Sequence, residues 1–241
     1  MIRIASTICI VGVVSAASVS AEPLEEFGAR GRIILSADRL SPFLSYTRIQ
    51  QDQGGGNSVT TSTTSFSPLW TASPQNLYDI PHFAFDYVVV PHLTVGGYAS
   101  VTLPASSTQS TTQNGTTTSQ DGAKLSALGI GARGGYLVAL TPRLWFWPRA
   151  GLSYTRESTT STALGQGNEL SVSVSQIALN LEPQLALHLV PHFALTLGLV
   201  FDIPLTGTQH SEFTLNQTTI STDTDSSQLH IGFTAGLLGW W

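Results

Sequence analysis

The chain has 241 residues, of which only 10% are charged, with 15 Asp or Glu residues against 10 Lys or Arg residues. Soluble domains carry about 25% charged residues, and this acidic balance leaves no basic patch for nucleic acid. The one cysteine, Cys9, lies in the N-terminal segment. Disulfides, thiolate metal sites and thiol nucleophiles are therefore excluded from the rest of the chain.

The N-terminus has the pattern of a secretory signal. Arg3 precedes an apolar run from Ile4 to Val14, and small residues follow as far as Ala21. A membrane anchor helix is disfavoured because it would need about 20 apolar residues. The pattern predicts a signal peptide at residues 1–21, cut after Ala21, and a single β-domain at residues 22–241.

The first expected strand region, residues 31–51, is irregular. Apolar side chains occupy odd positions up to Ala37 and even positions from Leu40 onward. The phase slips at Asp38–Arg39, as a β-bulge would produce. We expect one long, bulged strand rather than two, followed by a long loop over residues 52–79.

The middle of the chain alternates between strand patterns and polar tracts. Apolar residues at every second position predict strands at residues 83–90, 93–103, 128–140 and 144–154, and another begins at Leu170. The tracts between them are rich in Ser and Thr, and we expect loops there because such low-complexity segments cannot build a core. These expected loops are residues 104–122, 158–168 and 207–226.

Residues 177–205 carry the clearest pattern. Apolar side chains occupy every odd position from Ile177 to Leu189 and again from Phe193 to Leu205. Strict alternation predicts a β-hairpin with one apolar face and one face of small or polar side chains. A soluble sheet would cover the apolar face with a second layer, whereas a membrane barrel would turn it to lipid.

Turn prolines recur through the chain at Pro91, Pro142 and Pro191, each followed by His or Arg and then an apolar strand. The strand that begins at Leu170 runs into the first arm of the hairpin at residues 177–205, and a last strand is expected at residues 228–241, so the strand count is eight. Short turns at one end and long polar segments at the other describe an up-and-down meander. Only helices and closed sheets satisfy all backbone hydrogen bonds in lipid. The expected fold is therefore an all-β, eight-stranded antiparallel transmembrane β-barrel, with a secreted β-sandwich as the alternative.

The C-terminus ends in an aromatic residue preceded by apolar residues at alternate positions: Ile231, Phe233, Leu237 and Trp241. This ending resembles the assembly signal of bacterial outer-membrane barrels, and residues 28–241 look like a small OmpA-like or OmpX-like barrel. The resemblance implies that the chain sits in outer-membrane lipid of a Gram-negative cell. It also implies insertion by the barrel-assembly machinery with the help of periplasmic chaperones.

Five charged residues occupy strand positions that alternate with the apolar ones and would face the inside of such a barrel: Asp86, Arg133, Arg149, Glu182 and Asp202. An eight-stranded barrel is barely wide enough for its side chains. Charges buried there must pair, so we expect the three acids to face the two arginines and plug the lumen. The alternative is a narrow pathway for small solutes. The pattern does not assign Asp38 and Arg39 to a face.

These observations predict a non-enzymatic protein with a structural, adhesive or receptor-like role carried by the polar loops. No motif indicates a cofactor or a metal, no nucleic acid is expected as a partner, and an extracellular ligand would be of unknown kind. The alternatives are a minor passive channel and an outer-leaflet lipid-modifying enzyme. Such an enzyme would draw on polar residues of the last loop, namely His210, Ser211, Glu212, Asp223 and Asp225.

Overall fold

The computed structural model describes residues 27–52, 58–66, 80–102, 108–113, 116–121, 124–161, 169–215 and 218–241. The signal peptide predicted at residues 1–21 lies outside the described residues. No helix in the described part of the chain is long and apolar enough to cross a membrane.

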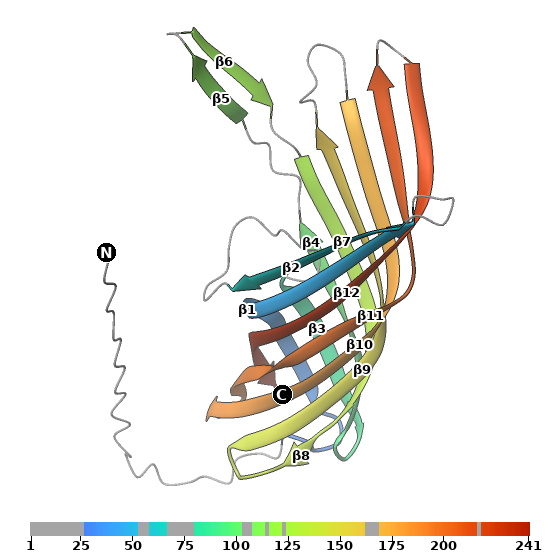
Figure 1. Ribbon diagram of the computed structural model, residues 1–241. Helices are drawn as coiled ribbons and strands as arrows, with labels where there is room; N and C mark the ends of the chain where they lie inside the picture. The colour runs from blue at the N-terminus through green and yellow to red at the C-terminus, as the bar shows by residue number, and fades with distance from the viewer. Residues whose placement is uncertain are drawn as a thin grey trace, which may run out of the picture.

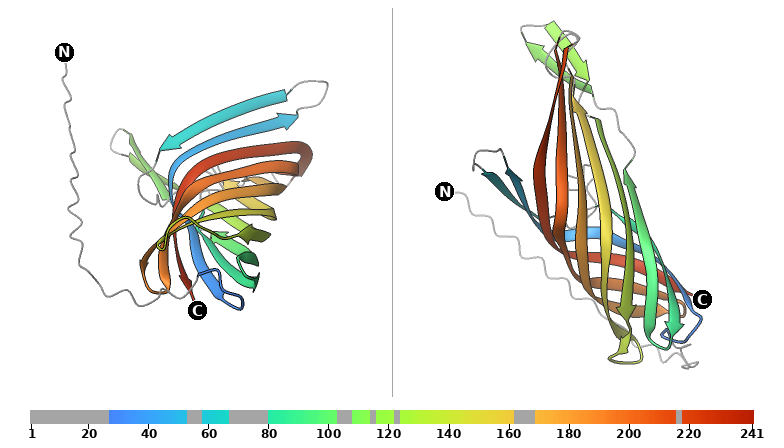
Figure 2. Two further views of the ribbon diagram at one scale, coloured as in Figure 1. Left: turned by 90° about the horizontal axis from the view of Figure 1, so that it is seen from below. Right: turned by 90° about the vertical axis from the view of Figure 1, so that its right-hand side faces the viewer.

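Eight antiparallel strands form a closed ring (Figures 1 and 2). Their order around the ring is β10, β11, β12, β1, β3, β4, β7 and β9, and pairing of β9 with β10 closes it. The predicted eight-stranded antiparallel barrel is confirmed. The ring strands are β1 (Ile33–Asp52), β3 (His82–Val90), β4 (Leu93–Thr102), β7 (Lys124–Tyr136), β9 (Leu144–Ser161), β10 (Glu169–Val190), β11 (Phe193–Leu215) and β12 (Thr218–Trp240). The short β8 (Val138–Ala139) pairs with β9 beside the ring.

Side chains alternate between the lumen and the outer face, as the sequence pattern predicts. In β3, Phe83 and Phe85 are exposed on the outside, whereas Ala84 and Asp86 are buried inside. Large apolar residues cover the outer face of the other ring strands in the same way. A closed sheet with an apolar outer band and a polar interior is the architecture of outer-membrane barrels. The protein is an outer-membrane β-barrel.

The tight turns lie at the end of the barrel where the C-terminus lies (Figure 1). In two of them a proline is followed by a histidine with positive φ, 71° at His92 and 64° at His192. A type II turn requires a positive φ at its second central position, and proline is common at the first. These turns close the β3–β4 and β10–β11 hairpins, as the repeated Pro-His pattern predicts.

The first strand is a single, bulged strand of 20 residues, as predicted. Its register against β12 shifts between Ala37 and Ser41 and again between Pro42 and Leu44. Arg39 lies within the first irregularity and has a φ of 58°. Bulges re-aim side chains, and here the irregularity directs both Asp38 and Arg39 into the lumen, where they are buried.

Two prolines stand inside ring strands, where a missing N–H usually interrupts the ladder. Pro148 of β9 lies directly opposite Pro183 of β10. The β9–β10 register continues through this pair without a shift.

The expectation of long loops is wrong wherever the structure describes these segments; residues 53–57, 67–79, 103–107 and 162–168 lie outside the described residues. The segment at 52–79 contains β2 (Ser58–Phe66), which pairs with β1, and the segment at 104–122 contains β5 (Thr108–Gln113) paired with β6 (Thr116–Asp121). β9 continues to Ser161, and β11 and β12 run through nearly all of 207–226. Low hydrophobicity excludes a core but leaves the backbone ladder intact, and β-branched Thr favours extended structure.

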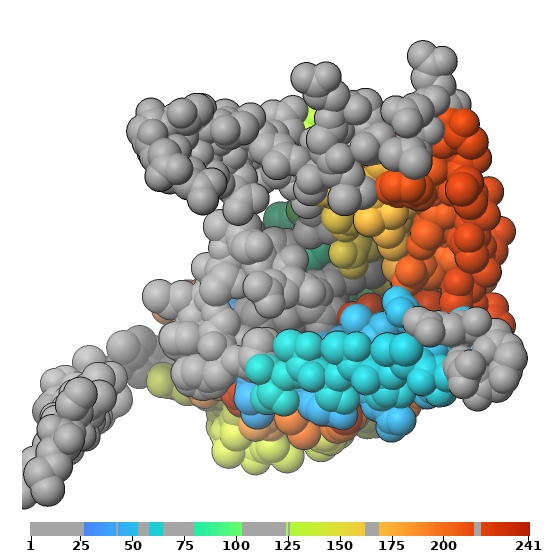
Figure 3. All heavy atoms as spheres, turned by 45° about the horizontal axis from the view of Figure 1, so that its top comes forward, coloured from blue at the N-terminus to red at the C-terminus, as the bar shows by residue number. Residues whose placement is uncertain are grey.

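The extracellular part is consequently a tall β-extension. Strands β7, β9, β10, β11 and β12 rise well beyond the short β3 and β4, while β1 and β2 turn aside (Figures 1 and 2). Figure 3 shows β2 in front and the tall strands β9 to β12 behind it. Polar residues predicted to be loops thus form a continuation of the barrel wall.

Candidate functional site: the lumen and the extracellular cavity

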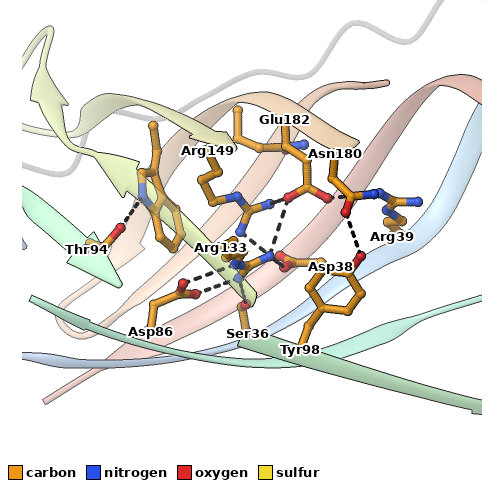
Figure 4. A network of polar contacts seen from close by, with 12 residues as sticks. Ser36, Asp38, Arg39, Asp86, Thr94, Tyr98, Arg133, Arg149, Asn180 and Glu182 are labelled. Carbon is orange, nitrogen blue, oxygen red and sulfur yellow. Dashed lines mark hydrogen bonds and ion pairs between the residues drawn. The ribbon is translucent and has the colours of Figure 1, made fainter. Parts of the chain in front are cut away.

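All eight ring strands contribute side chains to one polar network in the lumen, which we call the lumenal charge network. Figure 4 shows the part of it that lies around Arg133 and Arg149. Of the five residues predicted to face one another, Asp86 and Glu182 contact the two predicted arginines, whereas Asp202 pairs with Arg39 instead and joins the others through it. Every member is buried. Its members are Asp38 and Arg39 of β1, Asp86 of β3, Tyr98 of β4, Arg133 of β7, Arg149 of β9, Asn180 and Glu182 of β10, Asp202 of β11 and His230 of β12.

Arg133 binds three carboxylates at once. Its Nε and Nη2 donate to the two oxygens of Asp86 at 3.0 and 2.6 Å. Its Nη1 donates to Asp38 at 2.6 Å and to Glu182 at 3.4 Å. A bidentate pair with short, charge-assisted bonds fixes the orientation of the guanidinium group, so β1, β3, β7 and β10 are joined across the lumen.

Glu182 is the carboxylate shared by all three buried arginines. One oxygen accepts from Arg39 at 2.9 Å, and the other lies 2.8 Å from Arg149 and 3.4 Å from Arg133. Arg149 also donates to Asp38 at 3.1 Å. The three arginines are therefore connected through shared carboxylates, Glu182 for all three and Asp38 for Arg133 and Arg149.

Arg39 and its partners form the other half of the network. The guanidinium group makes a bidentate contact with Asp202 at 2.8 and 2.9 Å. Asp202 also accepts from Asn180 and is 2.8 Å from Nδ1 of His230. Sequence reasoning left Arg39 unassigned and did not place His230 with the charges. For Asp38 and Arg39, the phase slip in the alternation was the signal that neither residue follows the regular inside–outside order of the strand.

One gap inside the charge network is too small to hold a water molecule. It is bounded by Tyr98, Arg133, Arg149 and Glu182. Glycines on β7 make this packing possible, because a Cβ at Gly131 would lie 2.5 Å from the Tyr98 ring. The Tyr98 ring thus fills the space that Gly131 leaves.

We expect Gly131→Ala to lower the free energy of unfolding by about 1–3 kcal/mol, because the added methyl group would overpack the wall against Tyr98. The control is Gly134→Ala on the same strand, where the nearest atom to an added Cβ is 3.5 Å away. Urea unfolding of both variants in lipid vesicles measures the difference. Equal midpoints for the two variants would show that the lumen is loosely packed.

An aromatic cluster closes the lumen at the tight-turn end. Phe27 has no exposed surface, and its ring makes edge contacts with Trp145, Trp147, His188 and Trp240 at centroid distances of 5.0 to 5.9 Å. These four partners come from three ring strands. Water would have to pass both this aromatic cluster and the lumenal charge network to cross the barrel.

A cavity of about 150 Å³ lies in the extracellular half of the barrel, which we call the vestibule cavity. Its wall contains four glutamines, three hydroxyl-bearing side chains, three aliphatic side chains and one charged residue, Glu157. Gln51 donates to Gln209 at 2.6 Å, which joins β1 to β11 across the wall. This cavity offers space for a small ligand.

The polar residues considered for an outer-leaflet enzyme separate onto two faces of the extension. His210 lies on the outer face, 2.5 Å from Asp223 and 3.2 Å from Glu212. Ser211 is the next residue along the strand and therefore points to the opposite face, where it accepts from Gln209. Asp225 stands opposite Thr208. A Ser-His-acid arrangement is not assembled from these residues.

His210 gives the extension a pH-dependent contact. Hydrogen bonds to Asp223 and then to Glu212 raise the pKa of His210 above its usual value of 6.5. A raised folded-state pKa means that the contact stabilises the hairpin below about pH 6.5 and is lost as pH rises through the folded-state pKa. We expect NMR titration to give a lower His210 pKa in Asp223→Asn than in the natural chain. Asp225→Asn should leave it unchanged, and equal values in all three proteins would contradict the assignment.

The residues of the predicted C-terminal signal lie on the outer face of β12, apart from Trp241, which directly follows the strand. Phe233, Leu237 and Trp241 are exposed, and Ile231 is half-buried. β12 pairs with β1 through most of its length. The signal residues thus stand beside the seam at which the first and last strands of the chain meet. Their role in assembly stays a prediction.

Comparison with protein-family models gives no match, and comparison with curated proteins gives none either. Among solved structures, the chain is similar to the outer-membrane protein AlkL in lipid bilayers, with 15% identity, a TM-score of 0.43 and coverage of 91% of this chain and 96% of that one. It is also similar to the outer-membrane protease OmpT of Escherichia coli, with 10% identity, a TM-score of 0.41 and coverage of 88% and 97%. The attachment invasion locus protein Ail of Yersinia pestis matches at 10% identity and a TM-score of 0.30, covering 86% and 99%. These three proteins differ in role, and none of their activities is carried over to this chain.

Proposed function

We propose that the protein is a sealed outer-membrane barrel whose extracellular β-extension serves an adhesive or receptor-like role. The observation that carries the proposal is the lumenal charge network, to which every ring strand contributes and which joins opposite walls of the lumen by buried ion pairs. A barrel closed in this way does not offer a route for solutes. Its remaining accessible surface lies in the tall strands beyond the membrane.

The composition of the extension supports a binding role. Its strands carry many Ser, Thr, Gln and Asn side chains, which donate and accept hydrogen bonds without fixed charge. The strands are ordered by backbone ladders, so such groups are presented on a rigid surface. Ordering before binding lowers the entropic cost of association.

The partners in the membrane follow from the same architecture. Outer-membrane lipid would contact the apolar outer band. Insertion would involve the barrel-assembly machinery and periplasmic chaperones, with the outer face of the C-terminal strand as the recognition element. These partners are inferred from the barrel form and from the terminal sequence.

The adhesive role can be tested by shortening one hairpin. Thr208 and Asp225 stand directly opposite each other on β11 and β12, so an Asn-Gly turn can join them and replace residues 209–224. We expect cells that display the shortened protein to lose adherence to surfaces coated with collagen, heparin or chitin, whereas cells with the natural chain adhere to at least one. Heat-modifiable gel mobility would verify that the shortened barrel still closes. Equal adherence of both proteins, or adherence by neither, would overturn the role.

Solute flux provides the second arm of the test. Vesicles containing the natural protein should not swell in an isotonic solution of a small sugar, in contrast to vesicles containing a general porin. Swelling at the porin rate would favour the passive-channel alternative over the sealed barrel.

A further inference from the structure

The vestibule cavity has one charged side chain, and that charge is not neutralised by the protein. Glu157 of β9 lines the cavity and is half-buried. Its directly opposed neighbours are Ala127 on β7 and Val174 on β10, both apolar. Among the described residues no hydrogen-bond or ion-pair partner is found for its carboxylate.

The basic residues of the extracellular half lie elsewhere. Arg48, Lys124 and Arg156 are exposed and have the outward parity of their strands. The segments outside the described residues between positions 53 and 217 contain no Lys, Arg or His. The sequence therefore offers no further internal base that could approach Glu157 from those segments.

Glu157 lies above the membrane band. The apolar stripe on the outside of β9 ends at Tyr154, and the next outward residues are Arg156, Ser158 and Thr160. At this level the carboxylate is reached from the extracellular solvent, although burial raises its pKa. Desolvation of a charge without a partner is unfavourable, and a cationic ligand would relieve that cost.

The rest of the wall determines what kind of cation fits. Ile49, Val172 and Val174 supply apolar surface, and the amides of Gln51 and Gln209 lie on the same wall. We propose that the vestibule cavity binds a small organic ammonium ion, with the charged nitrogen at Glu157 and the alkyl part against the aliphatic side chains. The inference adds a ligand class to the receptor-like role proposed above and rests on it.

The size of the cavity limits the ligand. A dry cavity of about 150 Å³ accommodates a benzene-sized molecule, which has about six non-hydrogen atoms. A bare divalent cation would prefer several oxygen ligands from the protein, and no cluster of three His, Cys, Asp or Glu side chains suited to a metal occurs among the described residues. A neutral solute of this size would leave the carboxylate without a counter-charge.

The test is titration calorimetry of n-butylammonium chloride against the protein in phosphatidylcholine nanodiscs. We expect saturable binding of one ion per barrel, weakened at least about tenfold in Glu157→Gln because a charge-assisted contact is removed. Glu212→Gln is the matched control, since Glu212 is an exposed carboxylate on the outer face of the extension. It should bind as the natural chain does.

A second variant keeps the proposal testable if Glu157→Gln fails to fold. Val174→Lys would place a tethered ammonium directly opposite Glu157, and we expect it to abolish binding of n-butylammonium while the carboxylate remains. Equal affinity for n-butanol, unchanged binding in both variants, or no saturable binding to the natural chain would each overturn the inference. Adherence and solute flux are separate measurements, so failure of the proposed function would be seen independently.

Discussion

Arg133→Met is expected to lower the free energy of unfolding by about 3–5 kcal/mol, the cost of removing one partner from a buried ion pair. The network contains three guanidinium groups and four carboxylates, those of Asp38, Asp86, Glu182 and Asp202. Loss of Arg133 leaves two guanidinium groups against four carboxylates. Asp86 would lose its bidentate partner in a site with no exposed surface.

The same charge count predicts a smaller effect at Glu182. Glu182→Ala should also lower stability, because it removes a group that all three arginines contact. It leaves three guanidinium groups against three carboxylates, however, so the loss should be smaller than for Arg133→Met. Urea unfolding in lipid vesicles measures both variants, with exposed Arg156→Met on the neighbouring strand β9 as the control. The reverse order, or a midpoint for Arg133→Met equal to that of the control, would refute lumenal pairing as a source of stability.

Trp147→Ala is expected to cost about 3–5 kcal/mol, the range for deleting a large buried aromatic side chain. Trp147 has no exposed surface. Its indole donates to Thr94 at 3.1 Å, and its ring lies 4.6 Å from the guanidinium carbon of Arg149. The side chain therefore links the aromatic cluster around Phe27 to the lumenal charge network.

The stability of Trp147→Ala is again measured by urea unfolding in vesicles. Two further variants serve as comparisons. Trp147→Phe keeps a ring in the site and should lose less stability than the alanine variant. Phe146→Leu changes the neighbouring residue on the outward side of β9 and should cost less than about 1.5 kcal/mol, because an apolar group still faces lipid. A loss at Trp147 no larger than the loss at Phe146 would mean that the tight-turn end is not packed as the structure shows.

The barrel could be predicted from the sequence because the alternation of apolar and polar residues is a local pattern that recurs in most of its strands. Strict alternation at residues 177–205 specifies two strands and which face each side chain takes. The same parity placed Asp86, Arg133, Arg149, Glu182 and Asp202 on the lumen side. Odd or even position does not show which strands face one another across the lumen. The contacts of Glu182 with three arginines, from β1, β7 and β9, therefore became visible only in the structure.

Two features escaped prediction for physical reasons. The Ser/Thr tracts have no apolar face, so nothing in residues 207–226 distinguished a loop from a strand with water on both sides, and cross-strand pairing decided it. Arg39 was hidden because its bulge interrupts the alternation on which the interpretation of β1 depended. Phe27 was missed because it precedes the first strand and is buried only by side chains from distant strands.

The central claim is that the lumen is sealed, and planar-bilayer recording tests it most directly. The natural protein, inserted into a bilayer in concentrated KCl, is predicted to give no stepwise single-channel currents, while a porin in the same bilayer gives them. Reproducible current steps of uniform size from the natural protein would contradict the sealed lumen, because ions would then be crossing both the aromatic cluster and the lumenal charge network.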